Sequence, residues 1–374
     1  MKILFLIIED WAFISHRLHL AKYAKKMGHK VYVLCKINNG CSEINSTEIN
    51  LYSWNISRKS YNIFREFRTI RDTQNTLNDF SPDIIHAVGL KPVIYSFVAS
   101  ILTGSRNRVL ALGGLGYLFS SKSLKAFFLL PFIKLAYKIS FSFRNTIVIL
   151  QNNDDKKIIL ENNLINNSRV KIIKGAGVEE NKFVPTLENE KNLKVLFPAR
   201  MLWDKGIVEF VEIARKIKIL NIDVKFILSG ARDTHNPECV PLEKINEWVE
   251  DGLVEWLGHC KNMSKIYSDV NIVCLPSYRE GLPKSLLEAC SCSRPVVAFD
   301  VPGCREVVVD GFNGFLVPFG DVEKMFQRVL QLLKSSALRK KMGINGRKKI
   351  LNEFSSAIIN KKVVNVWKEL YSRN

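Results

Sequence analysis

Short apolar segments typical of buried strands alternate with longer amphipathic segments typical of helices along this chain of 374 residues. Such alternation predicts parallel sheets that are covered by helices on both faces. A polar stretch that contains a proline, residues 183–192, separates two such series, and the chain is long enough for two domains. We therefore predict an α/β protein with one domain at 1–185 and a second at 192–352, followed by a last helix.

The two series can be assigned segment by segment. In the first domain we predict strands at 3–8, 30–35, 83–87, 108–112, 146–150 and 170–173, with helices at 14–26, 61–77 and 93–102. In the second domain we predict strands at 193–198, 224–229, 254–256, 272–275 and 295–299, with helices at 207–219, 241–250, 264–269, 284–290 and 322–335. Neither domain has a P-loop or a Gly-x-Gly-x-x-Gly after its first strand, which argues against a dinucleotide-binding oxidoreductase.

Glu280 and Glu288 flank a turn between a predicted strand and a predicted helix. Glu280 follows the strand, and open α/β sheets bind ligands at the carboxyl ends of their strands. The turn Gly281-Leu282-Pro283 leads into a helix start, where backbone N–H groups without intrahelical partners form an anion site. Carboxylates that accept hydroxyl hydrogen bonds beside such N–H groups suit a nucleotide sugar. For the spacing alone, two solvated surface glutamates are the alternative.

Arg200 and Lys205 occupy the matching place after the first strand of the second domain. The planar fork of an arginine suits phosphate, and a lysine adds a flexible point charge. Together they can neutralise a departing nucleoside diphosphate without a metal ion. The chain contains no Asp-x-Asp, the usual carboxylate pair for a metal-bound nucleotide sugar, so we expect no metal and no other cofactor. Plain surface charge is the alternative for this pair in so basic a chain.

With these residues the chain resembles the retaining glycosyltransferases of family 4. That family has the GT-B fold, in which two Rossmann-like domains with parallel sheets face each other across a cleft. The resemblance rests on Arg200 with Lys205, on Glu280 with Glu288, and on the downstream segments 302–307 and 310–317. It runs nearly end to end and implies that the last helix, within 356–374, packs back on the first domain.

The first domain is most similar to bacterial enzymes that extend undecaprenyl-diphosphate-linked oligosaccharides, particularly α-1,3-N-acetylgalactosaminyltransferases. The segments that carry this similarity are 15–17, 86 with 91–92, and 113–119. The resemblance implies that the domain 1–185 binds a polyprenyl-diphosphate-linked glycan acceptor, as in O-antigen, capsule or lipid-linked glycan synthesis. It implies that the domain 192–352 binds a UDP-sugar, with an N-acetylhexosamine as the transferred sugar.

The resemblance also implies a role for each residue of the donor site. Glu280, Arg200 and Lys205 are the catalytic candidates, because the two cations would stabilise the leaving diphosphate and Glu280 would hold the donor sugar's hydroxyls. Glu288 would accept hydrogen bonds from the ribose, and the backbone of Gly281, Leu282 and Pro283 would hold sugar and phosphate. The acceptor would attack the donor's own face without a protein nucleophile. A double displacement with Glu280 as nucleophile is the alternative.

Five residues of the first domain are candidates for the acceptor side. Ser15 can cap a helix that begins at His16 and Arg17, which would bring both side chains to a positive helix end. His86 follows two isoleucines at a predicted strand end, and Lys91 precedes the proline that starts the next helix. The alternatives are exposed polar residues in the first case and a core histidine in the second.

Three glycines in four residues follow the predicted strand 108–112, at Gly113, Gly114 and Gly116. Glycines permit left-handed backbone angles and close approach of a ligand, as a loop that borders a sugar would require. Many family 4 enzymes have a histidine at about the position of Gly113. Its absence here puts a side-chain role in doubt, and the backbone N–H groups of the loop can substitute.

The net charge of +19 is concentrated in the first domain, where residues 1–150 carry 20 Lys and Arg against 8 Asp and Glu. No acidic residue falls in 84–153, and such a stretch predicts an extended anionic partner, either nucleic acid or a membrane surface. Within it the apolar run 126–143 has the composition of an interfacial helix. Lys122 and Lys125 precede this run, and Lys134 and Lys138 lie within it.

These features favour a cytoplasmic protein that is peripherally bound to the inner face of the membrane. No segment reaches eighteen uninterrupted apolar residues, so we expect no spanning helix. The eight cysteines contain no Cys-x-x-Cys pair and are expected to be reduced thiols, several of them in the core. An ordinary core helix with a solvated lysine edge is the alternative for 126–143.

Two other classes of function are compatible with parts of the sequence. A nucleic-acid-binding protein would explain the charge, but it predicts aromatic and basic residues interleaved on one surface, whereas these aromatics cluster with aliphatics. We therefore expect no nucleic acid among the partners. A sugar epimerase of the same fold would need no acceptor, and a phosphorylase of this fold would hold pyridoxal phosphate.

Overall fold

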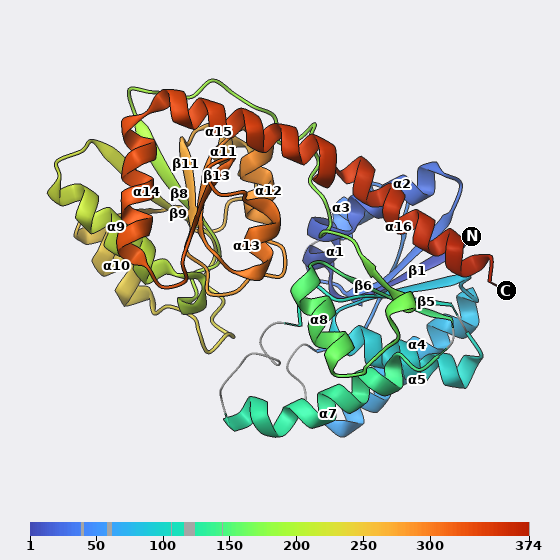
Figure 1. Cartoon of the computed structure of the whole chain (residues 1–374). Helices are drawn as coiled ribbons and strands as arrows, with labels where there is room; N and C mark the ends of the chain where they lie inside the picture. Colours follow the sequence, from blue (N-terminus) through green and yellow to red (C-terminus); the bar gives the residue numbers. More distant parts are fainter. Residues whose placement is uncertain (39–40, 58–61, 106, 116–123, 144, 374) are drawn as a thin grey trace. The chain divides into compact units, whose positions relative to one another are not determined.

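The computed structural model describes residues 1–38, 41–57, 62–105, 107–115, 124–143 and 145–373. The chain forms two compact units, residues 1–176 with 356–374, and residues 177–355 (Figure 1). The paired strands of each unit form one parallel sheet, as the strand–helix alternation predicted. None of the described helices is long and apolar enough to cross a bilayer.

The first unit is built on a seven-stranded sheet in the order β3-β2-β1-β4-β5-β6-β7. Its strands are β1 Lys2–Glu9, β2 Lys30–Lys36, β3 Asn50–Ser53, β4 Ile84–Val88, β5 Arg108–Ala111, β6 Thr146–Leu150 and β7 Val170–Ile172. Its helices are α1 Asp10–His16, α2 Leu18–Lys26, α3 Cys41–Asn45, α4 Ile63–Phe80, α5 Leu90–Thr103, α7 Leu124–Ser140, α8 Asn153–Glu161 and α16 Ser356–Tyr371, with a 3₁₀ turn at Asn167–Arg169. The edge strand β3 was not predicted, because it is short, polar and mostly exposed.

The strands of this sheet are apolar throughout because both faces are covered. Alternate residues of β1 point to opposite faces, so Phe5 belongs to a core with α1, α2 and α16, and Leu4 to a core with α4, α5, α7 and α8. The returning helix α16 closes the first of these cores with Trp367, whose ring centroid lies 5.8 Å from that of Phe5. The packing of the last helix on the first unit was a prediction of the family resemblance.

The second unit has a six-stranded sheet in the order β10-β9-β8-β11-β12-β13. Its strands are β8 Leu193–Pro198, β9 Val224–Ser229, β10 Glu255–Trp256, β11 Ile272–Leu275, β12 Val296–Phe299 and β13 Gly314–Val317. Its helices are α9 Ile207–Ile219, α10 Leu242–Glu250, α11 Met263–Ser268, α12 Lys284–Ser291, α13 Pro302–Val307, α14 Val322–Lys334 and α15 Ser336–Lys349, with a 3₁₀ turn at Trp203–Lys205 and a π turn at Ile350–Phe354. The strand β13 was not predicted, although its segment was noted as part of the family pattern.

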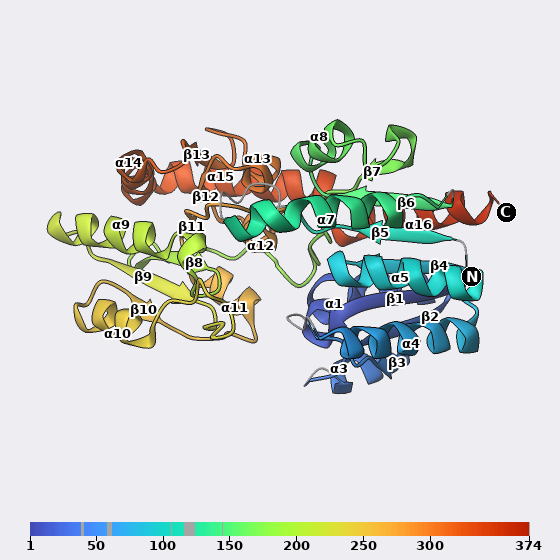
Figure 2. The ribbon, with the colours of Figure 1, turned by 90° about the horizontal axis from the view of Figure 1, so that it is seen from below.

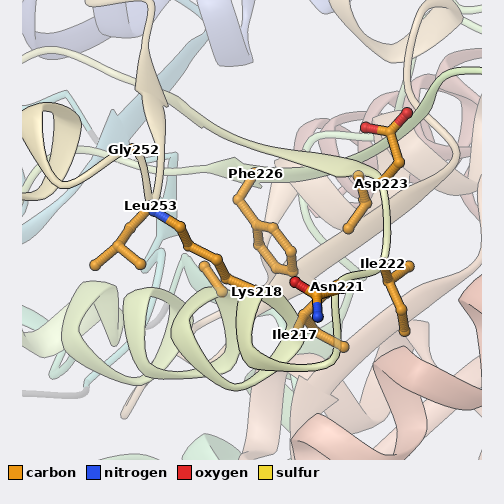
Figure 3. Close-up of a pocket in the computed structure, with 10 residues that line it drawn as sticks. Ile217, Lys218, Asn221, Ile222, Asp223, Phe226, Gly252 and Leu253 are labelled. Atoms are coloured by element: carbon orange, nitrogen blue, oxygen red, sulfur yellow. The ribbon is translucent and has the colours of Figure 1, made fainter.

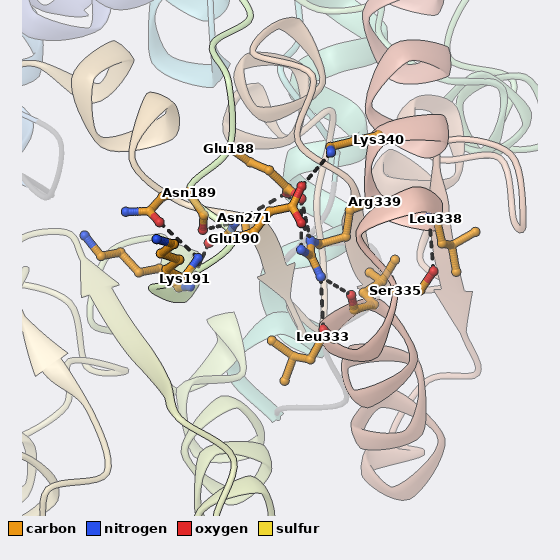
Figure 4. Close-up of polar contacts among 12 residues, drawn as sticks. Glu188, Asn189, Glu190, Lys191, Asn271, Leu333, Ser335, Leu338, Arg339 and Lys340 are labelled. Atoms are coloured by element: carbon orange, nitrogen blue, oxygen red, sulfur yellow. Dashed lines mark hydrogen bonds and ion pairs between the residues drawn. The ribbon is translucent and has the colours of Figure 1, made fainter.

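The polar stretch 183–192, which the sequence suggests as a boundary, belongs to the second unit and is attached to it by hydrogen bonds. Glu188 accepts two hydrogen bonds from the Arg339 guanidinium, Nε to Oε2 at 3.0 Å and Nη2 to Oε1 at 2.9 Å (Figure 4). The Arg339 and Glu188 side chains are only 2% and 6% exposed. The Arg347 guanidinium donates to the carbonyl of Phe183 at 2.8 Å. The change from one unit to the next therefore falls earlier, between residues 176 and 177.

Candidate functional site

Each sheet has one point at which the strand order reverses, between β1 and β4 in the first unit and between β8 and β11 in the second. In open α/β sheets, ligands bind outside the carboxyl ends of the strands at this point. Arg200 and Lys205 follow β8, and Glu280 follows β11, its neighbour in the sheet. The structure therefore brings the three predicted catalytic residues to loops at one edge of one sheet.

These two loops are joined by their backbones. The N–H of Tyr278 donates to the carbonyl of Asp204 at 2.9 Å, and the Ser277 hydroxyl approaches the same oxygen at 3.4 Å. Gly206 adopts φ = +77°, and a Cβ atom there would lie 1.9 Å from the Pro276 carbonyl oxygen. Only glycine fits this crossing, because any side chain would push the two loops apart. The loop after β8 is thus held against the loop after β11.

Lys205 and Glu280 form an ion pair across the two loops. The lysine Nζ lies 2.8 Å from Oε1 of Glu280, and both side chains are 16% exposed. The carbonyl of Glu280 also accepts a hydrogen bond from the N–H of Gly303 at 3.1 Å, and a Cβ atom at Gly303 would lie 2.5 Å from that oxygen. Backbone contacts from α13 and a cation from the other loop therefore both position Glu280.

Glu288 lies in α12, the helix that starts at the same edge of the sheet after the N-cap Pro283. The residue is 8% exposed, and the Lys284 ammonium one turn earlier is 3.4 Å from its Oε1. Burial raises the pKa of Glu288, and the neighbouring Lys284 opposes that shift. Burial also raises the pKa of Tyr267 in α11 well above its usual value, and the nearby Glu288 adds to the effect. Glu288 is therefore a buried, oriented carboxylate.

Arg200 is the most exposed of the predicted donor residues that form ion pairs, with 42% of its side chain exposed. Its Nη1 lies 2.7 Å from Oδ2 of Asp233, in the loop after β9. Asp233 was not predicted as a site residue. It stands four residues after β9, so its place near a strand end was a signal that could have marked it, but no motif singled it out. Gly281 and Leu282, between Glu280 and α12, are half-buried.

The predicted helix cap at Ser15 is wrong. The helix begins earlier, at Asp10, and Ser15 and His16 lie in its last turn, where the helix end is negative rather than positive. Asp10 is the first residue of this helix, a place where a negative charge is favourable, and its carboxylate accepts the N–H of Trp11 at 2.7 Å. Arg17 separates α1 from α2 and is 8% exposed, and burial lowers its pKa to about 10.

The placement of His86 at a strand end is also wrong. His86 stands in the middle of β4 and is 1% exposed. The indole N–H of Trp367 donates to its Nδ1 at 3.1 Å, and the ring of Phe5 lies 5.1 Å away between centroids. Burial lowers the pKa of His86 well below its usual value, and nearby Arg17 adds to the shift. His86 is therefore a neutral core histidine that ties α16 to the first sheet.

Lys91 and the described glycines lie in loops and turns at the carboxyl edge of the first sheet. Lys91 is in the first turn of α5, and its ammonium is 3.0 Å from Oε1 of Glu66 in α4. Gly113 and Gly114 follow β5 and are exposed, and Gly114 has φ = +135°, which a side chain rarely tolerates. Gly116 lies outside the described residues. Of the two described glycines, only Gly114 has a backbone conformation that calls for glycine.

A surface hollow of about 290 Å³ lies elsewhere in the second unit (Figure 3). It is lined by the end of α9, by the segment that enters β9, and by Gly252 and Leu253. Because β9 begins there, the hollow is at the amino edge of the sheet, and none of the predicted donor residues lines it. Within the described parts of the chain, no three His, Cys, Asp or Glu side chains are grouped so that they could hold a metal ion.

Comparison with known families decides how these two units are to be read. Residues 178–349 match the family described as glycosyl transferases group 1, and residues 2–152 match the family described as glycosyl transferase 4-like. The two matches fall on the two units and cover most of the chain. The chain is a family 4 glycosyltransferase. The GT-B class of fold predicted from the sequence is confirmed.

Among the relatives of this glycosyltransferase is the N,N'-diacetylbacillosaminyl-diphospho-undecaprenol alpha-1,3-N-acetylgalactosaminyltransferase of Campylobacter jejuni. The two are 27% identical over 358 residues, which cover 92% of this chain and 93% of the relative. The UDP-Gal:alpha-D-GlcNAc-diphosphoundecaprenol alpha-1,3-galactosyltransferase of Escherichia coli is 24% identical over 91% of this chain and 88% of its own length. In fold, the chain is similar to a sucrose-phosphate synthase of Thermosynechococcus elongatus, with a TM-score of 0.82, 17% identity and complete coverage of both chains.

Proposed function

We propose that this glycosyltransferase moves an N-acetylhexosamine from a UDP-sugar to a glycan linked to undecaprenyl diphosphate, with retention of the anomeric configuration. The observation that carries the proposal is the Lys205–Glu280 pair at the reversal point of the second sheet, 2.8 Å apart. In this pair Lys205 supplies a cation for the diphosphate, and Glu280 supplies a carboxylate for the sugar hydroxyls. The two relatives that span nearly the whole chain are both named for diphosphoundecaprenol acceptors. Such a reaction belongs to O-antigen, capsule or lipid-linked glycan synthesis.

The second unit is proposed as the donor side. Arg200 and Lys205 stabilise the negative charge that develops on the leaving UDP, and Glu280 accepts hydrogen bonds from the donor sugar. The buried carboxylate of Glu288 accepts the ribose hydroxyls. The backbone of residues 281–283 and the first turn of α12 offer N–H groups to the diphosphate.

The first unit is proposed as the acceptor side. Of its predicted residues, Lys91 and the glycines 113 and 114 remain candidates at the carboxyl edge of the first sheet. The acceptor hydroxyl attacks the same face of the sugar from which UDP departs, and the leaving phosphate takes the proton. Because the cations of Arg200 and Lys205 balance the charge of the diphosphate, the reaction proceeds without a metal ion.

The test of this function is a panel of nucleotide sugars, each incubated with the purified enzyme with and without a polyprenyl-diphosphate-linked acceptor. UDP release that depends on the acceptor, and that survives EDTA, is the expected result. Loss of activity in EDTA and its return with Mg²⁺ or Mn²⁺ would refute the metal-free reaction. A changed sugar product formed from the donor alone would instead identify an epimerase of the same fold.

A peripheral membrane surface is proposed on the first unit, where α4, α5 and α7 lie side by side over one face of the sheet (Figure 2). On α7 the exposed apolar side chains are Phe132, Leu135 and Ile139, which share one face of the helix and are 72%, 55% and 45% exposed. The interfacial interpretation of 126–143 requires a correction, since Tyr137 and Phe141 on the opposite face are buried in the core. The side chains of residues 122–129 lie outside the described part of the structure.

Exposed apolar side chains also occur on the neighbouring helices α5 and α4. Ile101 and Leu102 at the end of α5 are 55% and 56% exposed. On α4, Phe64 and Phe67 are 82% and 64% exposed and share a face with two exposed arginines, Arg68 and Arg71. Together with the exposed aliphatic side chains of α5 and α7, this face suits an anionic lipid surface, into which apolar side chains insert while cations meet the headgroups. The aromatic and basic residues of α4 taken alone also fit the pattern expected of a nucleic-acid partner, so the test below includes RNA.

We predict that the enzyme sediments with vesicles that contain phosphatidylglycerol and much less with neutral phosphatidylcholine vesicles. Replacing Arg68, Arg71, Lys134 and Lys138 by Gln should weaken the anionic binding by at least about tenfold, because each basic residue near such a surface contributes on the order of 1 kcal/mol. Replacing Phe64, Phe67 and Phe132 by Ser should weaken binding at every salt concentration. Added salt should weaken wild-type binding, since exposed charges are screened over about 10 Å at 0.1 M.

The matched control is Ile219→Ser, which removes an apolar side chain that is 73% exposed in the second unit. It should leave vesicle binding unchanged. Turnover of a short water-soluble acceptor should be the same in all variants. Equal sedimentation of the wild type and both multiple variants would disprove the membrane surface, and salt-sensitive binding to RNA in place of vesicles would favour a nucleic-acid partner.

A further inference from the structure

The arginine predicted to meet the donor diphosphate is already paired with a carboxylate. Arg200 Nη1 lies 2.7 Å from Asp233 Oδ2, and the two side chains are 42% and 25% exposed. Such a pair is accessible to solvent and contributes little to stability. It can therefore open when a stronger anion arrives.

The backbone of the second unit holds Asp233 where it is. The loop after β9 is joined to the loop after β8 by hydrogen bonds from the N–H of Met201 to the Ala231 carbonyl at 3.1 Å and from the N–H of Trp203 to the Glu238 carbonyl at 2.9 Å. At Gly230 a Cβ atom would lie 1.9 Å from the carbonyl oxygen of Ala199, so the two segments are in direct contact. The Arg200–Asp233 pair is thus placed by the fold and does not depend on chance contacts of two free side chains.

The neighbouring ion pairs indicate which carboxylate can be exchanged for a diphosphate. Lys205 pairs with Glu280 at 2.8 Å, and Lys284 with Glu288 at 3.4 Å. Arg200, Lys205 and Lys284 therefore each have a carboxylate beside them, and these three pairs together carry no net charge. A diphosphate gains one of these three cations in full only if its carboxylate gives it up. Glu280 and Glu288 have proposed roles toward the sugar and the ribose, which leaves Asp233 as the carboxylate to be exchanged.

We propose that Asp233 is the resting counter-ion of Arg200 and that the diphosphate of the donor displaces it. The inference rests on the proposed function, because it takes the ligand to be a nucleoside diphosphate. Before the donor binds, Asp233 holds the Arg200 guanidinium at the edge of the sheet. When the donor arrives, Asp233 competes with its phosphates for that guanidinium. Donor binding is consequently weaker than the cations alone would allow, and the released UDP is not retained.

The test is a titration of wild type and variants with UDP and, separately, with uridine. Asp233→Asn should tighten UDP binding by about threefold to fivefold, the range of an exposed ion pair. Uridine binding should not change, because uridine has no phosphate to compete. The gain should disappear in an Arg200→Gln background, in which no guanidinium remains to be released. A purely structural role of Asp233 would not separate UDP from uridine.

The matched control is Asp269→Asn, which removes the same charge from a 2.7 Å pair with Lys194 near the start of β8, about 20 Å along the strand from Arg200. It should leave UDP affinity unchanged. Weaker or unaltered UDP binding by Asp233→Asn, or the same gain without Arg200, would overturn the exchange. A folded wild type that binds no UDP would instead overturn the proposed function, so the two failures are distinguishable.

Discussion

Replacement of Lys205 by Ala, or of Glu288 by Gln, is expected to lower sugar transfer by about 10² to 10³ in kcat/KM. In the proposed reaction Lys205 supplies a cation to the leaving diphosphate, and its loss also leaves Glu280 without the partner that now lies 2.8 Å away. Glu288→Gln keeps the shape of the side chain but removes a buried charge that is oriented beside Lys284. The measurement is initial rate against donor concentration at saturating acceptor.

The two variants should differ in which constant changes. Charge on the diphosphate develops mainly in the transition state, so Lys205→Ala should act chiefly on kcat. The ribose is present in both ground and transition states, so Glu288→Gln should act chiefly on the KM of the donor. Glu280→Gln, measured alongside them, should lower kcat. Wild-type enzyme incubated with donor alone should show no mass increase from a glycosyl-enzyme, since no protein nucleophile is proposed.

Lys225→Ala serves as the control for these variants. Lys225 pairs with Glu255 at 2.7 Å in the same unit, but it lies near the start of β9 and both side chains are half exposed. It should retain the wild-type rate. Circular dichroism and thermal unfolding must show that Lys205→Ala and Glu288→Gln are folded. Near-normal kcat/KM in both would exclude the donor-site assignment.

Arg200, Lys205 and Glu280 could be brought together from the sequence because each of them stands in the loop that follows an apolar strand. A parallel sheet brings the carboxyl ends of neighbouring strands to one edge, so Lys205 and Glu280 had to lie close once β8 and β11 were identified. The same rule places Asp233, four residues after β9, at this edge, but it does not reveal that Asp233 pairs with Arg200. That pairing depends on hydrogen bonds between two irregular loops, and such backbone contacts leave no periodic pattern in the sequence.

The first unit shows the opposite case, in which polar residues at apparent strand or helix ends are structural. His86 was placed at a strand end because only two apolar residues precede it, but β4 continues to Val88 and Trp367 covers the ring. The partner is 281 residues away in sequence, so no local pattern could reveal it. Ser15 was taken as a helix cap, but the helix begins at Asp10, about one and a half turns earlier.

The segment between the two series was misjudged for a related reason. Residues 183–192 are polar and mostly exposed, which is typical of a linker. Their attachment comes from arginines on distant helices, above all Arg339 in α15. A sequence pattern reflects the exposed side chains of such a segment, whereas its buried groups, Phe183 in the core and Glu188 beside Arg339, attach it to the second unit.

The loss of that glutamate should therefore be strongly destabilising. Glu188→Ala leaves the Arg339 guanidinium, which is 2% exposed, without its carboxylate, and an unpaired buried charge costs about 3–5 kcal/mol. For a unit of this size the midpoint of thermal unfolding should fall by roughly 6–20 °C. Two carbonyls, those of Leu332 and Leu333, still accept from Arg339 at 2.7 and 3.0 Å, but neither of them carries a compensating charge.

Glu190→Ala is the matched control, because Glu190 is two residues away and pairs with Lys340 on the same helix, with side chains that are about half exposed. It should leave the unfolding midpoint unchanged, since exposed pairs contribute little. The double variant Glu188→Leu with Arg339→Met should recover most of the lost stability, because it removes both charges and keeps the volume. Equal, small shifts for Glu188→Ala and Glu190→Ala in chemical denaturation would show that the buried pair does not hold the segment 183–192 to the second unit.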